Sequence, residues 1–334
     1  MTLGIWPPSP RPTTASIGAI PNGCSGPKSP SFSTTTIGDW GRKTLGKKPL
    51  VNRRSSDTYA TRLTKSIKRV TYRSSISRLV WRFRLAGILR TLYYWLNRPS
   101  ENVLHTEVAG LTASFYVRTP WELRALDPAG DIGHERHILE LLASSLRLGD
   151  VFYDIGSNFG VYAILFGKAV GPTGVVVAIE PEAQGYAHLE DNVRLNSLDN
   201  VRTFRLALGD HTGEEKLYLE FTGASRLTQS AVTRHGYETV MVMEGDRFVS
   251  VENLPNPHVV KIDVEGHEGA VIRGLAKTLA QPDCRLLCCE IHPQLLPPET
   301  PPEQILDLLK SLGFNRIEIH QRGTTEFHAL AYKS

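Results

Sequence analysis

From residue 151 onward, the hydrophobic and polar positions of the chain follow two alternating patterns. Short, almost wholly apolar runs, such as VVVAI and VVKIDV, are each followed by a longer segment with apolar positions three or four residues apart. Short apolar runs are typical of strands buried on both faces, and the longer spacing is typical of helices. The alternation predicts an α/β fold with a doubly wound, mostly parallel sheet.

The pattern places each element along the chain. Core strands are expected at residues 151–155, 174–179, 201–206, 259–264, 285–292 and 316–320. Helices are expected at 134–146, 160–170, 183–195, 267–279 and 301–312, with extended segments at 215–221 and 237–243. Residues 327–332 are expected to close the sheet as an antiparallel edge strand, and residues 103–118 to form two short strands around a turn at Ala109–Gly110.

The N-terminal part has a different composition. Residues 1–73 are basic and rich in Ser, Thr, Pro and Gly, so they bury too little apolar surface to offset the entropy of ordering and are expected to be disordered. They resemble either an organelle transit peptide or an unstructured extension. We therefore divide the chain into a disordered segment (1–73), a helix and short strands packing on the core (74–130), and a catalytic domain (131–334).

Residues 74–97 predict a helix with large apolar side chains and interleaved arginines. One interpretation is an interfacial helix that rests on anionic lipid. The other is a helix that packs on the catalytic domain through Trp81, Leu85, Leu92 and Trp95. No window of about 20 residues is apolar enough to span a bilayer, and no secretory signal is recognised at the N-terminus.

The net charge of +4 conceals an asymmetry between the two parts. Residues 1–100 hold 18 Lys and Arg but only two Asp and Glu, whereas the remainder holds 20 Lys and Arg and 32 Asp and Glu. An acidic catalytic half argues against nucleic acid as a partner, because phosphate binding needs a positive surface. The four cysteines have neither zinc-ligand spacing nor a disulfide framework, which favours a reducing, cytoplasmic setting.

The turn after the first core strand carries the most informative motif, DIGSNFG at 154–160. Ligands of doubly wound sheets bind outside the carboxyl ends of the strands, so this turn faces a cofactor. Gly156 permits a tight turn, and Asn158 stands where a dinucleotide site has its second glycine. Asp154 would repel a pyrophosphate but attract the ammonium and sulfonium of S-adenosyl-methionine. The motif therefore favours this cofactor over NAD(P).

The second strand ends at Glu180, 24 residues after Gly156. An acid at this offset is placed to accept hydrogen bonds from ribose hydroxyls. The alternative interpretation is a favourable charge at the N-terminus of the next helix.

Two further strands end in acids and a histidine. Strand alternation in KIDVEGHE (261–268) puts Lys261, Asp263 and Glu265 on one face, and in CCEIHP (288–293) it puts Glu290 and His292 on one face. Acids are rarely buried without a function, and an acceptor hydroxyl needs a base or a metal to become nucleophilic. We expect Asp263, Glu265, Glu290 and His292 to line the catalytic site, with His292 as the candidate base by its usual pKa. Structural ion pairs and a helix cap are the alternatives. A divalent metal held by these acids is a lesser alternative, because no ligand spacing indicates one.

Together, DIGSNFGVYA, the Glu180–Pro181 pair, LALGD at 206–210 and KIDVEGHE resemble the FkbM-type methyltransferases over about residues 135–330. The resemblance implies a class I methyltransferase fold, which is Rossmann-like, and O-methylation with S-adenosyl-methionine of a sugar, glycolipid or other small metabolite. By resemblance, Asp154, Gly156, Ser157, Asn158 and Gly160 belong to the turn that holds the methionine portion, and Glu180 holds the ribose. Ala207, Leu208 and Asp210 lie near the adenine by the same resemblance.

The chain departs from the family where many members have Leu-Asp-Asp before the KIDVEG strand and this chain reads MEGDRF at 243–248. Two other functions are carried as alternatives. One is an NAD(P)-dependent oxidoreductase on a similar sheet, against which Asn158 argues. The other is a non-catalytic scaffold that keeps the fold and brings a partner to a membrane through residues 74–97.

Overall fold

The structure is a computed structural model that describes residues 85–127, 131–219, 225–227, 236–322 and 325–333, with only the backbone at 85–90 and 131. The segment 1–73, predicted to be disordered, lies outside these ranges. Of the predicted helix 74–97, the part from Leu85 is described.

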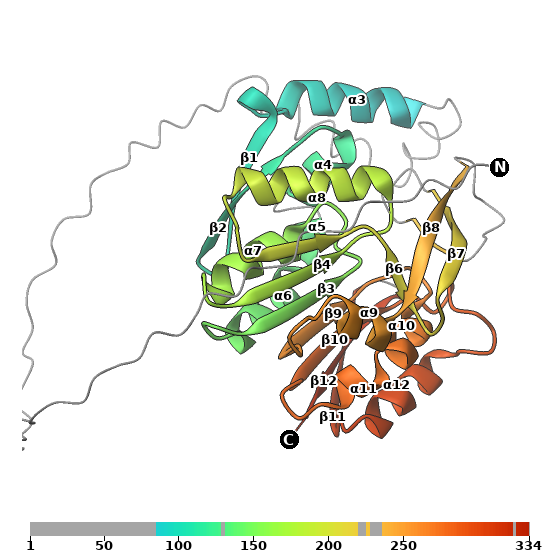
Figure 1. Cartoon of the computed structure of the whole chain (residues 1–334). Helices are drawn as coiled ribbons and strands as arrows, with labels where there is room; N and C mark the ends of the chain where they lie inside the picture. The colour runs from blue at the N-terminus through green and yellow to red at the C-terminus, as the bar shows by residue number, and fades with distance from the viewer. Residues whose placement is uncertain (1–84, 128–130, 220–224, 228–235, 323–324, 334) are drawn as a thin grey trace, which may run out of the picture. The chain divides into compact units, whose positions relative to one another are not determined.

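A seven-stranded sheet forms the centre of the described chain (Figure 1). Its strands are β3 (Val151–Ile155), β4 (Val175–Ile179), β5 (Val201–Phe204), β9 (Val259–Ile262), β10 (Leu286–Ile291), β11 (Arg316–Gln321) and β12 (Phe327–Tyr332). Their order is β11-β12-β10-β9-β3-β4-β5, and the strands from β10 to β5 are parallel. The chain reverses direction across the sheet between β3 and β9, so ligands are expected at the carboxyl ends of these two strands. The predicted doubly wound, mostly parallel sheet is confirmed.

The position predicted for residues 327–332 is wrong. Strand β12 is antiparallel, as expected, but it pairs with β10 on one side and β11 on the other, so β11 is the edge. Residues 328–331 are all buried, whereas β11 keeps exposed and partly exposed side chains. A strand with four consecutive buried residues needs neighbours on both sides, and a more polar strand tolerates the edge.

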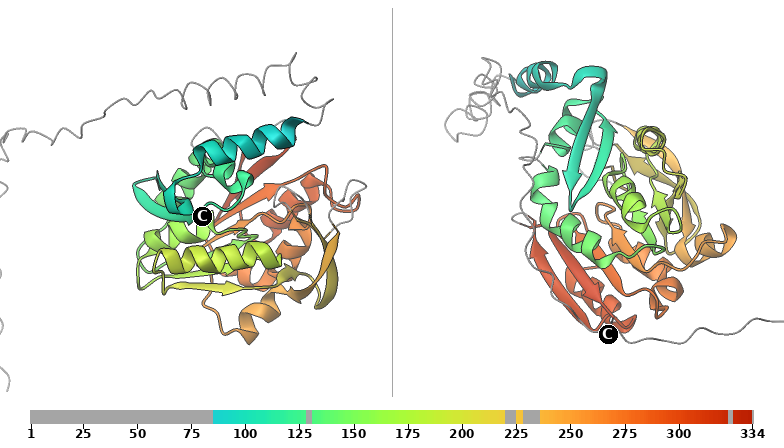
Figure 2. Two further views of the ribbon diagram at one scale, coloured as in Figure 1. Left: turned by 90° about the horizontal axis from the view of Figure 1, so that it is seen from above. Right: turned by 90° about the vertical axis from the view of Figure 1, so that its left-hand side faces the viewer.

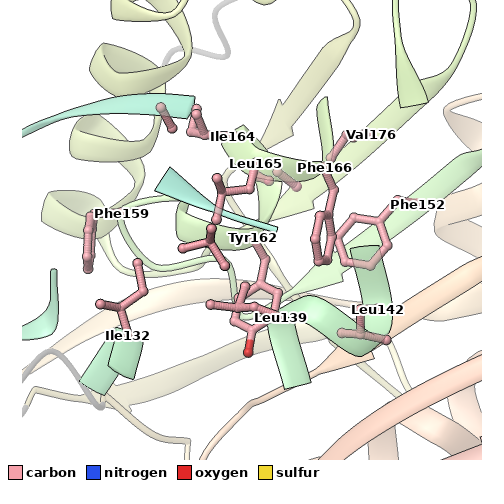
Figure 3. Packing of buried hydrophobic residues seen from close by; sticks show 14 of the residues in the cluster. Ile132, Leu139, Leu142, Phe152, Phe159, Tyr162, Ile164, Leu165, Phe166 and Val176 are labelled. Carbon is pink, nitrogen blue, oxygen red and sulfur yellow. The ribbon is translucent and has the colours of Figure 1, made fainter. Parts of the chain in front are cut away.

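Helices cover both faces of this sheet. They are α6 (Arg136–Ser145), α7 (Val161–Val170), α8 (Ala183–Leu195), α9 (Gly245–Val251), α10 (Glu268–Gly274), α11 (Ala276–Ala280) and α12 (Pro302–Ser311). Successive side chains of β3 point to opposite faces: Phe152 joins one hydrophobic cluster with α6, α7 and α8, and Tyr153 joins another with α9 to α12. Figure 3 shows the first cluster, where Phe152 and Phe166 meet edge to face.

Two predicted helices are each divided in two, and two predicted strands, β5 and β9, end two residues early. The helix predicted at 134–146 consists of α5 (Asp131–His134) and α6, and that predicted at 267–279 consists of α10 and α11. The second break follows Gly274, which packs against the backbone of Gly209 so closely that a Cβ would lie 1.7 Å from the Gly209 oxygen. Strand β9 ends at Ile262, two residues earlier than predicted.

Two smaller sheets flank the central one. The predicted hairpin is confirmed as β1 (Val103–Val108) and β2 (Leu111–Tyr116), and it docks on α8 because Asn192 and Asn196 accept hydrogen bonds from the β2 backbone at 2.9 and 3.0 Å. Strands β6 (Ala207–Gly209), β7 (Gly213–Tyr218) and β8 (Tyr237–Glu244) form the other sheet.

Helix α3 (Leu85–Asn97) lies against α4 (Pro120–Ala125), away from the central sheet (Figure 2), and a short 3-10 helix, Ser100–Asn102, leads from it into β1. Leu92, Trp95 and Leu96 on this helix are 45%, 58% and 43% exposed. None of the helices in the described ranges is long and apolar enough to cross a membrane.

Candidate active site

The turn after β3 is held between the ends of its two neighbouring strands. The backbone amides of Gly156 and Ser157 both donate to the Ile179 carbonyl of β4, at 3.0 and 2.9 Å. On the other side, a Cβ at Gly156 would lie 1.8 Å from the Asp263 carbonyl oxygen, after β9. The glycine is therefore required by the neighbouring backbone as well as by its left-handed φ of 84°.

Asp154 lies beneath this turn, which differs from the direct cofactor contact expected. Its side chain is 1% exposed and lines neither of the two cavities described below, and its Oδ2 accepts a hydrogen bond from the Ala163 amide. Burial raises its pKa to about 6, although Lys261 opposes the shift. Ser157 joins the same scaffold, donating to the Asp154 carbonyl and accepting from the Ile179 amide. Asp154 thus shapes the turn from below.

The next two residues of the motif complete the turn. Asn158 adopts a left-handed φ of 51°, as its residue type allows, and lines both cavities. Gly160 lines neither cavity: it is the N-cap of α7 with a φ of 94°, and a Cβ there would lie 2.6 Å from Leu189. The role of Gly160 is therefore to bring α7 close to α8.

Glu180 follows β4 and faces the space above the sheet. One carboxylate oxygen accepts from the Asn158 amide at 2.7 Å and the other from the Glu182 amide at 2.9 Å. Burial raises the pKa of Glu180 from its usual 4.5 to about 8, and the two amide hydrogen bonds lower it by less. The carboxylate lines a cavity in the orientation expected for a ribose contact.

We call this cavity the first cavity; it encloses about 650 Å³ of space, part of which is open to solvent. Its wall is apolar near the β6 sheet and acidic near β3 and β9. It is lined by Ile155, Gly156, Asn158, Ile179, Glu180, Pro181, Leu206, Ala207, Leu208, Leu217, Ser225, Arg226, Leu227, Asp263, Val264, Glu265 and His267. Ala207 and Leu208 are among these lining residues, and their place near the adenine stays a prediction.

Asp210 does not line the first cavity, and its expected position near the adenine is wrong. Its carboxylate is paired with Arg273 at 2.9 Å on the protein surface, and 37% of the side chain is exposed. Strand β6 ends at Gly209, so the chain has already turned away from the cavity at this residue.

A second cavity of about 690 Å³ lies beside the first. It combines aromatic rings with charged groups. It is lined by Trp121, Ala125, Ile132, Glu135, Leu139, Gly156, Ser157, Asn158, Phe159, Val161, Tyr162, Lys261, Asp263, Glu265 and Arg322.

The two cavities meet at four shared residues, Gly156, Asn158, Asp263 and Glu265. The Asp263 amide donates to the Ile155 carbonyl, which continues the pairing of β9 with β3 past the end of the strand. Glu265 then adopts a left-handed φ of 52°, so the simple alternation assumed from the sequence does not extend to it. The two carboxylates nevertheless reach the same place, the junction of the cavities.

Lys261 lies under this junction. Its Nζ is 3.0 Å from Asp263 Oδ2 and 4.6 Å from the centre of the Tyr162 ring, and the side chain is 3% exposed. Burial alone would lower the pKa of this ammonium, but Asp263 and Asp154 raise it above its usual value. Lys261 is therefore a permanent positive charge that orients Asp263.

His292 is not the free base that the sequence suggested. Its ring is 2% exposed, and acidic side chains surround it. Burial alone would lower its pKa, but the carboxylates of Glu268, Glu290, Glu265 and Asp263 raise it to about 11. These carboxylates therefore favour a positive charge at the ring, either a proton on it or a cation beside it, over a neutral ring that waits for the proton of an acceptor.

Glu290 lies below the cavities and lines neither of them, contrary to expectation. Its side chain is fully buried between Arg322 and His328, whose Nε2 is 3.3 Å from Glu290 Oε2. Arg322 also contacts Glu135 at 2.5 Å, and Glu135 accepts a hydrogen bond from the Tyr162 hydroxyl at 2.8 Å. Glu290 thus belongs to a buried ionic network that supports the second cavity.

Sequence reasoning missed several residues of the site. Trp121, Glu135 and Arg322 come from segments far apart in the chain and carry no motif. Glu268 lies within the quoted KIDVEGHE, yet no role was assigned to it. An acid at the end of this motif was the available signal.

Known proteins resemble this chain in the part that carries the site. Residues 154–316 match the family model of the methyltransferase FkbM domain. The chain thus carries an FkbM methyltransferase domain at these residues. The resemblance seen in the sequence is confirmed, and the domain is an S-adenosyl-methionine-dependent methyltransferase domain. The predicted cofactor is thereby also confirmed, in preference to NAD(P).

Two relatives are similar to this chain in sequence. The hexuronic acid methyltransferase AglP of Haloferax volcanii is 29% identical over 189 residues, which cover 56% of this chain and 73% of AglP. Methyltransferase 1 of Beauveria bassiana is 25% identical over 142 residues, which cover 36% of this chain and 57% of that protein.

Two solved structures are distantly similar. The methyltransferase FkbM of Methylobacillus flagellatus has 14% identity and a TM-score of 0.38, covering 63% of this chain and 62% of its own. The precorrin-6y C5,15-methyltransferase of Geobacter metallireducens has 15% identity and a TM-score of 0.37, covering 60% and 89%. The fold class is shown by the strand order of the central sheet and not by these two similarities.

The residues of the first cavity fit the cofactor. Glu180 presents a carboxylate with one backbone donor on each oxygen, which leaves lone pairs for the two ribose hydroxyls. Leu206, Ala207, Leu208 and Leu217 provide an apolar wall for an adenine ring. Glu180, Asp263 and Glu265 give the lining more acidic than basic groups, as the positive charge of the cofactor requires.

Proposed function

We propose that the chain transfers a methyl group from S-adenosyl-methionine to a hydroxyl oxygen of a carbohydrate, with the cofactor in the first cavity and the acceptor in the second. The observation that carries this proposal is the junction of the two cavities at Asp263 and Glu265. Methyl transfer by in-line displacement needs donor and acceptor to approach from opposite sides of one point, and two cavities that share a wall allow this.

The lining of the second cavity supports a sugar as the acceptor. Trp121 and Phe159 lie edge to face, with ring centres 5.3 Å apart, and offer apolar surface to a sugar ring. Glu135, Lys261 and Arg322 offer charged hydrogen-bonding groups for hydroxyls or a carboxylate. The similarity to AglP, a hexuronic acid methyltransferase by name, supports an acidic sugar in particular.

The chemistry is divided between cofactor and protein. When bound, the sulfonium supplies an activated methyl group, so the protein chiefly orients the acceptor. We assign this role to Asp263 and Glu265, whose side chains are 24% and 23% exposed at the junction. They can accept a hydrogen bond from the acceptor hydroxyl, and one of them would take the proton that this hydroxyl loses when its oxygen gains the methyl group. Lys261 keeps Asp263 in place, and the acidic wall favours a positive sulfonium.

We further propose that the enzyme works in the reducing cytoplasm, at the surface of an anionic membrane. Cys284, Cys288 and Cys289 are free thiols, which agrees with a reducing compartment. Helix α3 exposes Leu92, Trp95 and Leu96, and Arg98 stacks on Trp95 at 3.9 Å, so apolar and basic groups lie together as lipid headgroups require. The excess of Lys and Arg in residues 1–100 adds positive charge, which an anionic lipid surface attracts.

The proposal is tested by incubating the full chain with methyl-labelled S-adenosyl-methionine and two matched acceptors, a glucuronide and the corresponding glucoside. The expected result is one methyl group gained on a hydroxyl of the glucuronide, located by mass spectrometry after release of the sugar. Cofactor binding without transfer to either sugar, or to sugars of a lysate, would contradict the proposal and favour the scaffold alternative. Transfer to nitrogen or carbon would contradict O-methylation alone.

A further inference from the structure

Three donor atoms converge at the junction of the two cavities. One oxygen each from Asp263 and Glu265 and the Nε2 atom of His292 all lie within 4.8 Å of one another. The two carboxylates are reached from both cavities, and the histidine, which is 2% exposed and lines neither cavity, lies behind them. A small ligand at this point would therefore face the cofactor and the acceptor together.

The Nε2 atom of His292 is unsatisfied although it is buried. It lies 3.9 Å from Asp263, 3.6 Å from Glu265 and 3.5 Å from Glu290, and it has no hydrogen-bond partner among the described residues. A buried polar atom left without a partner is costly in free energy. The gap between this nitrogen and the two junction carboxylates has the size that one bound ion would fill.

The other ring nitrogen of His292 is held in the way that metal-binding histidines are held. Nδ1 lies 2.8 Å from Glu268 Oε1, and Glu268 is fully buried. The same carboxylate oxygen accepts the Gly266 amide at 3.0 Å, so its position is fixed. A carboxylate that accepts the Nδ1 proton directs the Nε2 lone pair toward an ion and is the usual outer partner of a metal-bound histidine.

The two carboxylates are also oriented from outside the site. Lys261 binds Oδ2 of Asp263, which leaves Oδ1 as the atom nearest His292. Glu265 is placed by its left-handed backbone, and a Cβ at the following Gly266 would lie 2.5 Å from the Leu295 oxygen, so this turn has little freedom. A non-glycine residue with a left-handed backbone, such as Glu265, is strained and persists only where the surrounding structure holds it in place.

We infer that Asp263, Glu265 and His292 bind one divalent cation at the junction of the cavities. Two carboxylates and one imidazole suit Mg²⁺ or Mn²⁺ better than soft, thiolate-preferring ions. The acids Glu135, Asp263, Glu265, Glu268 and Glu290 outnumber the bases Lys261 and Arg322 around the site, which favours a cation. Three protein ligands leave positions open for an acceptor hydroxyl, whose pKa the ion lowers. This catalytic role rests on the proposed function, whereas the binding of the ion does not.

The test uses Mn²⁺ as the probe on the full chain after treatment with EDTA. Titration followed by electron paramagnetic resonance of free Mn²⁺ should show one bound ion per chain. Glu265→Gln and Asp263→Asn should each weaken binding at least tenfold, and Glu268→Gln should weaken it about 10- to 100-fold through His292. The control is Glu140→Gln, an exposed acid on α6 paired only with Arg136 among the described residues, and it should bind as the wild type does.

The outcomes separate this inference from the proposed function. The inference is overturned if wild-type protein binds no Mn²⁺ at about 1 mM, the weak end of protein sites for divalent cations, or if Glu265→Gln and Asp263→Asn keep wild-type affinity. Thermal unfolding of every variant identifies any that fail to fold. If Glu268→Gln fails to fold, Asp263→Asn and Glu265→Gln still test the inference, because these two ligands are partly exposed. Methyl transfer that persists in EDTA would refute the ion's catalytic role and leave the proposed function standing. Bound Mn²⁺ without methyl transfer to any sugar would refute the proposed function and leave the metal site standing.

Discussion

Gly156 and Asp263 lie in backbone contact, although 107 positions separate them in the chain: a Cβ at residue 156 would be 1.8 Å from the Asp263 carbonyl oxygen. This contact joins the cofactor turn after β3 to the acidic turn after β9. It places the wall of the first cavity next to the junction carboxylates. The spacing between the proposed cofactor and acceptor sites depends on it.

Gly156→Ala should therefore destabilise the protein and weaken cofactor binding. The added methyl group overlaps the Asp263 backbone, and alanine is also disfavoured at the φ of 84°. Together these effects should lower the free energy of unfolding by roughly 3 kcal/mol and abolish measurable binding of S-adenosyl-homocysteine. Urea unfolding and calorimetry measure the two quantities.

Gly110→Ala is the matched control, because Gly110 has a similar φ of 76° but nothing within 4 Å of the position of a Cβ. It should lower the free energy of unfolding by only about 1 kcal/mol and leave cofactor affinity unchanged. Equal losses in the two variants would show that the contact with Asp263 is unimportant.

Glu180 should make cofactor binding depend on pH. Burial raises its pKa to about 8, and ribose hydroxyls donate to the ionised form. Only about a tenth of the carboxyl groups are ionised at about pH 7 and about nine tenths at about pH 9. The affinity for S-adenosyl-homocysteine should therefore rise about tenfold between these pH values, with release of a proton on binding. Calorimetry in buffers of different ionisation enthalpy measures both.

The same group should affect the stability of the unliganded protein with a defined sign. Because the pKa of Glu180 is raised from 4.5 to about 8 on folding, the folded state binds more protons between these values. Its contribution to stability is therefore present below about pH 4.5 and is lost as the pH rises toward 8. In Glu180→Gln the tenfold change in affinity should be absent, and the pH dependence of stability should be reduced to what Asp154 and Glu265, whose pKa values burial also raises, contribute. Persistence of the tenfold change would assign it to another group.

Trp121→Ala should impair the acceptor without affecting the cofactor. Trp121 lines the second cavity and not the first, and its ring contacts Phe159. Loss of one aromatic surface should raise KM for the sugar about tenfold. Affinity for S-adenosyl-homocysteine should stay as in the wild type. A variant with normal KM would place the acceptor elsewhere.

Trp95→Ser combined with Leu92→Ser should reduce binding to anionic vesicles. Both side chains are exposed on α3. Sedimentation with phosphatidylglycerol vesicles should show binding of the wild type and at least tenfold weaker binding of the double variant, while neutral vesicles bind neither. An affinity for S-adenosyl-homocysteine equal to that of the wild type would show that the double variant is folded. Equal sedimentation of both proteins would argue against a lipid surface for this helix.

Much of the fold could be predicted because periodicity reports burial. The strands around Phe152 and Val177 are apolar on both faces, so their place inside a parallel sheet follows from local sequence. The position of β12 between β10 and β11 could not be predicted, since strand order depends on which neighbours cover it. The break between α10 and α11 arises from the packing of Gly274 on Gly209, a contact across the fold.

The positions of candidate site residues could be predicted where one motif contains them. Glu180 and the Gly156 turn line the first cavity because each lies at a strand end, where topology alone determines the position. The surroundings of His292 could not be predicted, since the sequence does not show that Glu268 and Glu290 pack around its ring. Arg322 was missed since its place beside Glu290 arises from the β11–β12 hairpin.

The central claim is that the first cavity holds the cofactor with its ribose on Glu180 and its sulfur toward Asp263 and Glu265. The most direct measurement is a crystal structure of the full chain with S-adenosyl-homocysteine. The account predicts the ribose hydroxyl oxygens about 3 Å from the Glu180 carboxylate and the thioether sulfur at the junction of the two cavities. A ligand bound outside the first cavity, or a Glu180 carboxylate turned away from the ribose, would contradict it.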